Sequence, residues 1–217
     1  MDGNRRWAKA RFMPALFGHK AGFDNLRDIA KLASKKWIWY LTVWALSTEN
    51  LVKRTPEEVA NILKLVDKTI TLLPEFMEQN IQVQLIGDIG KLPDKSQKIL
   101  GQLVSETQSN SGLILTIALV YGWQDEIIRA TKKIILAGKI PEEITEQEFK
   151  KYLDTAHLPN PDVIVRTGGD LRHSGFLLFD SAYSEYYFTE KKWPEFDEEE
   201  LDRVIEFFES SQRNFWK

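Results

Sequence analysis

Four short apolar runs constrain the fold of this chain more than any other feature of its sequence. The strongest extends from Ile38 to Leu46 and is rich in aromatic and β-branched residues. Apolar runs without polar alternation are typical of parallel strands covered on both faces. The other three cover residues 81–86, 113–120 and 162–165.

The segments before, between and after these runs have apolar residues at helical spacing. They cover residues 19–36, 56–79, 94–109, 124–137 and 197–211. In the second of these, Thr55 is a candidate N-cap and Pro56 lies in the first turn. Alternating strands and helices predict an α/β fold with a mostly parallel central sheet flanked by helices.

Length and composition favour a single domain over residues 1–217. The chain has no internal repeat and no long linker, and its 217 residues can bury a substantial core. A net charge of −3 argues against a nucleic-acid partner. With no cysteine, disulfides and cysteine-ligated metal sites are excluded. No apolar run is long enough to span a bilayer and no signal-peptide pattern is present, so we expect a cytoplasmic protein.

The first candidate site covers residues 2–7. Gly3 allows close backbone approach, and Asn4 is a candidate cap for a helix that begins near Arg5. Arg5 and Arg6 offer forked donors for phosphate oxygens, and Asp2 is a candidate ligand for Mg²⁺ beside a diphosphate. The alternative is a charged segment without a ligand. Further on, His19 either donates to the same phosphate or lies on the surface.

Two more candidate sites follow strands, where ligands of open α/β sheets bind. Ser47 and Asn50 come directly after the strongest strand, either as substrate contacts or as a helix cap and turn. After the last run, two glycines stand between Arg166 and Arg172, with Ser174 beyond them, in a pattern that favours an anion site. Glu185 is either a paired structural group or a metal ligand.

Two anion sites indicate two phosphate-bearing substrates or one long polyphosphate. The apolar stripe on residues 56–79 is either ordinary core or the lining of an apolar pocket. It consists of Val59, Ile62, Leu63, Val66, Ile70 and Leu73.

Five sequence blocks closely resemble, in order and spacing, those of the cis-prenyltransferase family of the undecaprenyl diphosphate synthase type. They are MDGNRRWA, GHKAG, LSTEN, VIVRTGGDLRHSGFLL and SAYSEYYFTEKKWPEF. The resemblance implies a Mg²⁺-dependent homodimer that condenses isopentenyl diphosphate with an allylic diphosphate, usually farnesyl diphosphate, forming Z double bonds. It also implies a polyprenyl diphosphate product, such as a cell wall lipid carrier, and peripheral membrane contact.

The resemblance implies a role for each matching residue. Asp2 and Asn50 match catalytic positions, and Asp2 and Glu185 match Mg²⁺ ligands. The matching substrate-binding positions are Gly3, Asn4, Arg5, Arg6, Trp7, His19, Ser47, Thr48, Glu49, Arg54, Arg166, Arg172, His173 and Ser174.

The chain also departs from the family pattern. A strand that normally precedes Met1 is missing, which predicts a truncated start. Ala15, Leu51 and Leu171 replace an arginine, a tryptophan and a histidine, which leaves rate and substrate preference open. Product length and the preferred allylic primer are not predicted.

Two other functions are compatible with parts of the sequence. An accessory subunit of a heteromeric enzyme would tend to lose the catalytic aspartate and the phosphate arginines, which are present here. A generic α/β phosphate-binding hydrolase would need a nucleophile elbow or a Walker loop, and the sequence contains neither.

Overall fold

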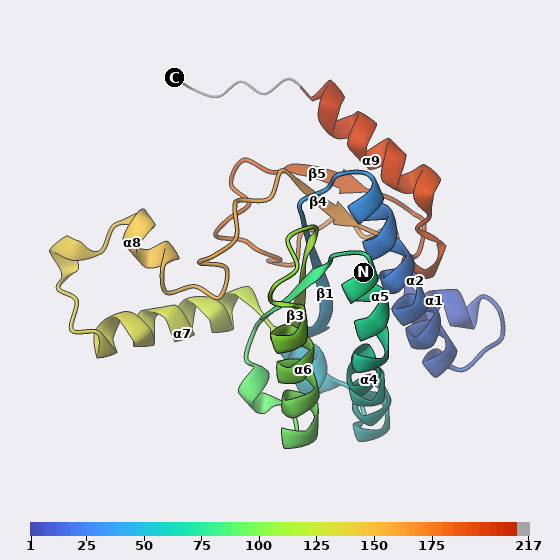
Figure 1. Cartoon of the computed structure of the whole chain (residues 1–217), viewed down its shortest axis with the longest axis horizontal. Helices are drawn as coiled ribbons and strands as arrows, with labels where there is room; N and C mark the ends of the chain where they lie inside the picture. The colour runs from blue at the N-terminus through green and yellow to red at the C-terminus, as the bar shows by residue number, and fades with distance from the viewer. Residues whose placement is uncertain (212–217) are drawn as a thin grey trace. The chain divides into compact units, whose positions relative to one another are not determined.

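A computed structural model describes residues 1–211 and has the α/β architecture that the apolar runs predicted (Figure 1). The chain forms two compact units. One contains Met1–Leu32, Asn160–Ser174 and the described residues from Phe179 onward. The other contains Ala33–Pro159 and Gly175–Leu178. The single domain predicted over residues 1–217 stays a prediction.

The unit around Ala33–Pro159 contains a three-stranded parallel sheet in the order β1-β3-β2. The strands are β1 (Tyr40–Ser47), β2 (Gln82–Ile86) and β3 (Ile114–Tyr121), each within two residues of the predicted bounds. From its second residue onward β3 is buried, as expected for a central strand. The predicted parallel sheet is therefore confirmed, although the five described strands form two sheets rather than one.

Six described α-helices of this unit, together with the last turn of α2, surround or extend from the sheet. Thr55 caps α4 as predicted, because its hydroxyl accepts a hydrogen bond from the Glu58 amide at 3.3 Å. Two short 3₁₀ turns lie between elements of this unit, at η2 (Ile89–Lys91) and η3 (Pro141–Glu143). The α-helices are α3 (Thr48–Lys53), α4 (Pro56–Lys68), α5 (Leu73–Glu78), α6 (Asp94–Thr107), α7 (Trp123–Leu136), α8 (Glu146–Lys150) and the last turn of α2 (Ala15–Lys35).

The prediction of one continuous helix over residues 56–79 was wrong. A 3₁₀ turn, η1 (Thr69–Leu72), separates α4 from α5. Pro74 has no amide hydrogen for the carbonyl four residues earlier, so an α-helix cannot pass it intact. The hydroxyls of Thr69 and Thr71 also donate to carbonyls three residues back, each at 2.7 Å, and compete with helical bonds.

An aromatic cluster covers part of the same sheet. The Trp44 and Phe176 rings stack with centroids 5.1 Å apart, and both lie edge-on to Tyr121. Phe176 follows Gly175, whose φ is 80°. A Cβ atom at Gly175 would lie 1.8 Å from the Trp123 ring, so only glycine fits at this position.

The other unit contains a parallel pair of strands, β4 (Val163–Arg166) and β5 (Glu185–Phe188). The sequence did not predict β5, which is only four residues long and half-buried. Around the pair lie α1 (Asn4–Lys9), most of α2, the 3₁₀ turn η4 (Trp193–Glu195) and α9 (Glu198–Ser210). Trp193 fixes η4 to α2, because its indole donates to the Gly22 carbonyl at 2.7 Å.

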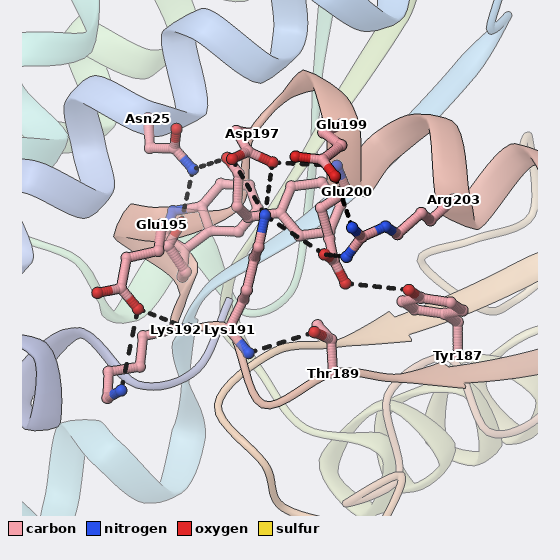
Figure 2. A network of polar contacts seen from close by, with 12 residues as sticks. Asn25, Tyr187, Thr189, Lys191, Lys192, Glu195, Asp197, Glu199, Glu200 and Arg203 are labelled. Atoms are coloured by element: carbon pink, nitrogen blue, oxygen red, sulfur yellow. Dashed lines mark hydrogen bonds and ion pairs between the residues drawn. The ribbon is translucent and has the colours of Figure 1, made fainter.

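A polar network connects β5 to the start of α9 (Figure 2). At its centre the carboxylate of Glu200, with 2% of the residue exposed, accepts a hydrogen bond from the Tyr187 hydroxyl at 3.0 Å. Lys191 and Arg203 lie 3.4 and 3.3 Å from the same carboxylate. Burial acts to raise the pKa of Glu200, but hydrogen bonds from Thr189 and Tyr187 and the charge of Lys191 lower it below its usual value.

The lowered pKa of Glu200 predicts acid sensitivity. The ionised carboxylate contributes stability above its unfolded pKa of about 4.3, and this contribution is lost as pH falls through the lower folded value. We expect Glu200→Gln to lower the free energy of unfolding by about 2 kcal/mol at neutral pH. Between about pH 5 and pH 3 the variant should lose less stability than the wild type.

Urea unfolding at several pH values measures both effects. Glu199→Gln is the matched control, because the Glu199 side chain is 69% exposed and pairs with the same Arg203. An equal effect of both substitutions would show that burial of Glu200 is not what matters.

Candidate functional site

The site is built where the end of β4 meets the segment before α1. Two glycines follow β4 with φ values of 91° for Gly168 and 82° for Gly169. A Cβ atom at Gly168 would lie 2.8 Å from the guanidinium of Arg6 and 3.2 Å from the backbone of Asp2. Gly168 therefore permits the close approach of the two segments.

Backbone contacts fix Asp2 in this position. The Asp2 amide donates to the Thr167 hydroxyl at 2.9 Å, and the same hydroxyl donates to the Asp2 carbonyl at 2.9 Å. The Trp193 amide donates to that carbonyl as well, also at 2.9 Å. Gly3 has a φ of 101°, and a Cβ there would meet Lys192 at 2.9 Å.

The Asp2 carboxylate is held in its ionised form. Its two oxygens accept hydrogen bonds from the Gly3 amide at 2.7 Å and from Arg166 at 3.0 Å, and Arg6 lies 3.5 Å away. Partial burial acts to raise the pKa of Asp2, but the hydrogen bonds from Arg166 and Gly3 and the charges of Arg166 and Arg6 lower it. A preformed carboxylate beside two arginines is thus available at neutral pH.

Arg166 is the most buried of the three arginines in this cluster, which are Arg6, Arg166 and Arg172. Its side chain is 15% exposed. Besides Asp2, its guanidinium donates to the Ser174 hydroxyl at 2.7 Å and to the Arg172 carbonyl. Arg166 therefore connects the end of β4 to the glycine loop that follows it.

Sequence reasoning missed Asp170, which joins the two predicted anion sites. Its carboxylate accepts hydrogen bonds from Arg6 at 3.1 Å and from Arg172 at 2.9 Å, and Arg166 lies 3.7 Å away. The three arginines are thereby gathered around one carboxylate. An aspartate placed between two arginines and directly after two glycines was the signal that could have identified it.

We expect Asp170→Asn to lower kcat/KM for the reaction proposed below by about tenfold to hundredfold, because Arg6 and Arg172 lose the charge that orients them. Steady-state kinetics with both substrates varied would measure the loss. Asp28→Asn is a control, since Asp28 is a carboxylate that pairs with its neighbour Arg27, away from this cluster in the sequence. Unchanged kinetics in Asp170→Asn would rule out an orienting role.

The other predicted residues of this unit make different contacts. Asn4 does not cap α1, contrary to the prediction, because α1 begins at Asn4 and its cap is Gly3, without a side-chain hydrogen bond. Trp7 lies beneath Arg11, whose guanidinium carbon is 4.3 Å from the ring centroid. Arg5 is exposed on α1, and His19 is half-buried on α2. The His173 ring lies 6.4 Å from that of Tyr186.

Glu185 is not brought to the cluster. It pairs with Val163 at the first position of β5, whereas Arg166 pairs with Phe188 at the last. Three residues of strand separate the two ends, or roughly 10 Å. Instead, Glu185 lines a pocket with Asp162, Asp180 and Tyr183, among others.

The remaining predicted residues lie in the other unit, at the carboxyl end of β1. The Ser47 hydroxyl accepts a hydrogen bond from the Asn50 amide at 3.0 Å and caps α3, the structural alternative considered for it. Thr48 lies against Gly122, where a Cβ would approach its hydroxyl to 2.4 Å. Glu49 pairs with Lys53, and the Arg54 amide donates to the Asn50 carbonyl at 3.2 Å.

No group of three or more histidine, aspartate or glutamate side chains in residues 1–211 is arranged to hold a metal ion by itself. None of the helices in the described part of the chain is long and apolar enough to cross a membrane. A parallel α/β fold with arginines gathered beyond the end of a strand is the arrangement expected of proteins that bind phosphate-bearing anions.

Comparison with known proteins agrees with this class of protein and gives the family within it. The family model for undecaprenyl diphosphate synthase matches residues 1–216. The isoprenyl transferase of Bacillus cereus is 43% identical over 220 residues, which cover 99% of this chain and 85% of the relative. That of Streptococcus pyogenes serotype M3 is 43% identical over 229 residues, which cover 100% of this chain and 90% of the relative.

A solved structure has the same fold. The lavandulyl diphosphate synthase from Lavandula x intermedia, in complex with dimethylallyl diphosphate, superposes with a TM-score of 0.94 at 30% identity. The match covers 99% of this chain and 94% of that one. The chain belongs to the undecaprenyl diphosphate synthase family of isoprenyl transferases, the cis-prenyltransferases that its sequence blocks resemble.

Proposed function

We propose that this protein condenses isopentenyl diphosphate with an allylic diphosphate, with farnesyl diphosphate as the expected primer, and forms a Z double bond at each addition. The observation that carries the proposal is the gathering of Arg6, Arg166 and Arg172 around Asp2 and Asp170. The dimethylallyl diphosphate held by the similar lavandulyl diphosphate synthase is itself an allylic diphosphate, which supports the proposed substrate class.

In the proposed reaction, the bond between the allylic carbon and its diphosphate oxygen breaks. The double bond of isopentenyl diphosphate supplies the electrons for the new carbon–carbon bond, and a proton is then lost. Arg6 would hold the departing diphosphate, and Arg166 with Arg172 and Ser174 would hold isopentenyl diphosphate. Fixed guanidinium donors stabilise negative charge on the leaving group without reorganisation.

The residues present fit a Mg²⁺ requirement. Asp2 offers an ionised oxygen ligand beside the arginines. Mg²⁺ usually keeps several waters and binds through one or two carboxylates together with substrate phosphates, so a site of few protein ligands is expected. When bound, Mg²⁺ supplies positive charge against the departing diphosphate. We assign Asp2 to this role, and Glu185 stays a second candidate ligand at the other end of β5.

Asn50 and Ser47 are proposed to act where the proton is lost, at the carboxyl end of β1. The Ser47–Asn50 hydrogen bond fixes the turn that presents both side chains. Ligands of open α/β sheets bind at this end of the strands, which supports the assignment.

We also propose that the protein is a homodimer. The surface at the end of α7 and beyond it presents exposed apolar side chains at Ile135, Leu136, Ile140 and Ile144. Several large exposed apolar side chains in one segment are typical of a protein interface. Sedimentation velocity would test the association state.

A product assay tests the function. The protein is incubated with Mg²⁺, farnesyl diphosphate and labelled isopentenyl diphosphate, and labelled polyprenyl product is separated by chain length. Product that requires both diphosphates would support the enzyme. A folded, dimeric protein that binds the diphosphates but yields no product would instead favour an accessory subunit. Release of inorganic phosphate from simple esters would favour a hydrolase.

A further inference from the structure

Three exposed aromatic residues lie within four positions of the chain where β1 begins. Trp37 is 81% exposed, Trp39 is 62% exposed and Tyr40 is 46% exposed. Lys35 and Lys36 precede them directly. Tryptophan usually buries most of its surface, so two exposed tryptophans within three residues require an explanation. We call these five residues the aromatic end.

Folding does not explain Trp37. The Trp37 amide donates to the Ser34 carbonyl at 3.3 Å, and the Ile38 amide donates to the Ala33 carbonyl at 3.0 Å. These are the two hydrogen bonds of a Schellman motif, in which the residue after the helix is left-handed and usually glycine. Trp37 occupies that position with a φ of 60°. Its large side chain is thus retained where glycine would be less strained and where it contributes little to the core.

The backbone beneath the aromatic end is fixed. The Ile114 amide donates to the Trp39 carbonyl at 2.8 Å, and Tyr40 pairs with Ile114 in the sheet. The aromatic rings are therefore presented from the edge of a sheet rather than from an unanchored loop. The end of α5 lies nearby, because the Ser34 hydroxyl donates to the Gln79 carbonyl at 3.5 Å.

The charge around the aromatic end is positive. Residues 29–48 contain Lys31, Lys35 and Lys36 and no acidic residue, in a chain whose net charge is −3. Glu78 is the exposed carboxylate on the nearby end of α5. Trp and Tyr prefer the boundary between lipid headgroups and acyl chains, and lysines at that level attract anionic lipids.

We propose that the aromatic end docks on the surface of an anionic lipid bilayer. A second copy of the chain is a poorer occupant, because a two-fold interface would place the lysine pair against itself. The surface lies at the opposite end of β1 from Ser47 and Asn50. If the proposed function holds, the bilayer meets the end of β1 that lies away from Ser47 and Asn50, the residues proposed to act where the proton is lost.

Flotation with lipid vesicles tests the docking independently of catalysis. The full chain is mixed with vesicles of phosphatidylcholine, with or without about a third phosphatidylglycerol. The double variant Trp37→Gly/Trp39→Ser should lower the partition coefficient at least about tenfold. Trp37→Gly relieves a left-handed residue, so thermal unfolding should show no loss of stability from that change. Replacing Lys35 or Lys36 by glutamine should lower binding to anionic vesicles about fivefold for each lysine.

Tyr183→Ser is the matched control, because Tyr183 is a 79% exposed aromatic in the other unit. Unchanged binding in this control, with loss in the tryptophan and lysine variants, would establish the aromatic end as the docking surface. Equal loss in the control, or wild-type binding by the tryptophan variant, would overturn the proposal. A changed association state with unchanged vesicle binding would assign the surface to a protein partner instead. Because vesicle binding needs no turnover, a negative product assay leaves this test intact.

Discussion

Replacing Asp2 by alanine is expected to lower kcat for polyprenyl synthesis by about 10³-fold or more, because the leaving diphosphate would lose both its proposed metal ligand and the group that orients two arginines. Asp2 accepts a hydrogen bond from Arg166 at 3.0 Å and lies 3.5 Å from Arg6. Its own backbone is fixed by Thr167. Asp170 lies beside the same two arginines but also pairs with Arg172, so we do not expect it to replace Asp2.

Asp2→Asn separates the charge of this residue from its shape. The asparagine retains an acceptor oxygen for the Gly3 amide, whose hydrogen bond to Asp2 is 2.7 Å long. Both variants should remain folded, as thermal unfolding would show, and both should lose activity to a similar extent. An asparagine variant with near wild-type kcat would contradict the assignment of Asp2 as the ionised metal ligand.

The sequence predicted the strands well because their apolar patterns are local and strong. β1, β2, β3 and β4 begin and end within two residues of the apolar runs. The break between α4 and α5 was missed, since the stripe of apolar residues continues across it while Pro74 and the threonine hydroxyls interrupt the backbone bonds. β5 was missed because four half-buried residues leave little periodic signal.

The site was predictable in its residue types but not in its contacts. Arginines flanking glycines after a strand indicated an anion site, and Arg166 and Arg172 do gather there. The convergence on Asp170 depends on how the chain brings α1 to the loop after β4, which no local pattern encodes. Glu185 was predicted at the site but is not brought to the arginines, because strand direction places it at the far end of β5 from Arg166.

Arg166 connects more residues of the cluster than Arg6 or Arg172 does. Its guanidinium serves Asp2, Ser174 and the Arg172 carbonyl at once, and its side chain is 15% exposed. A planar fork can satisfy three partners in fixed directions, whereas a lysine ammonium cannot match the same geometry. Removing the charge altogether would leave Asp2 and Asp170 with less compensation, so Arg166→Ala is expected to lower the free energy of unfolding by about 3 kcal/mol.

Arg166→Lys therefore tests the proposed role without removing the charge. We expect KM for isopentenyl diphosphate to rise and kcat/KM for it to fall about 10²-fold to 10³-fold, with a much smaller change in KM for the allylic primer. Arg6→Lys is the matched comparison, because Arg6 contacts the same two carboxylates from α1 and is assigned to the allylic diphosphate. Arg6→Lys should instead raise KM for the allylic primer. Steady-state kinetics with each substrate varied in turn measures both. If the two substitutions raised both KM values equally, the three arginines would form one shared anion site, and the division into two diphosphate sites would have to be abandoned.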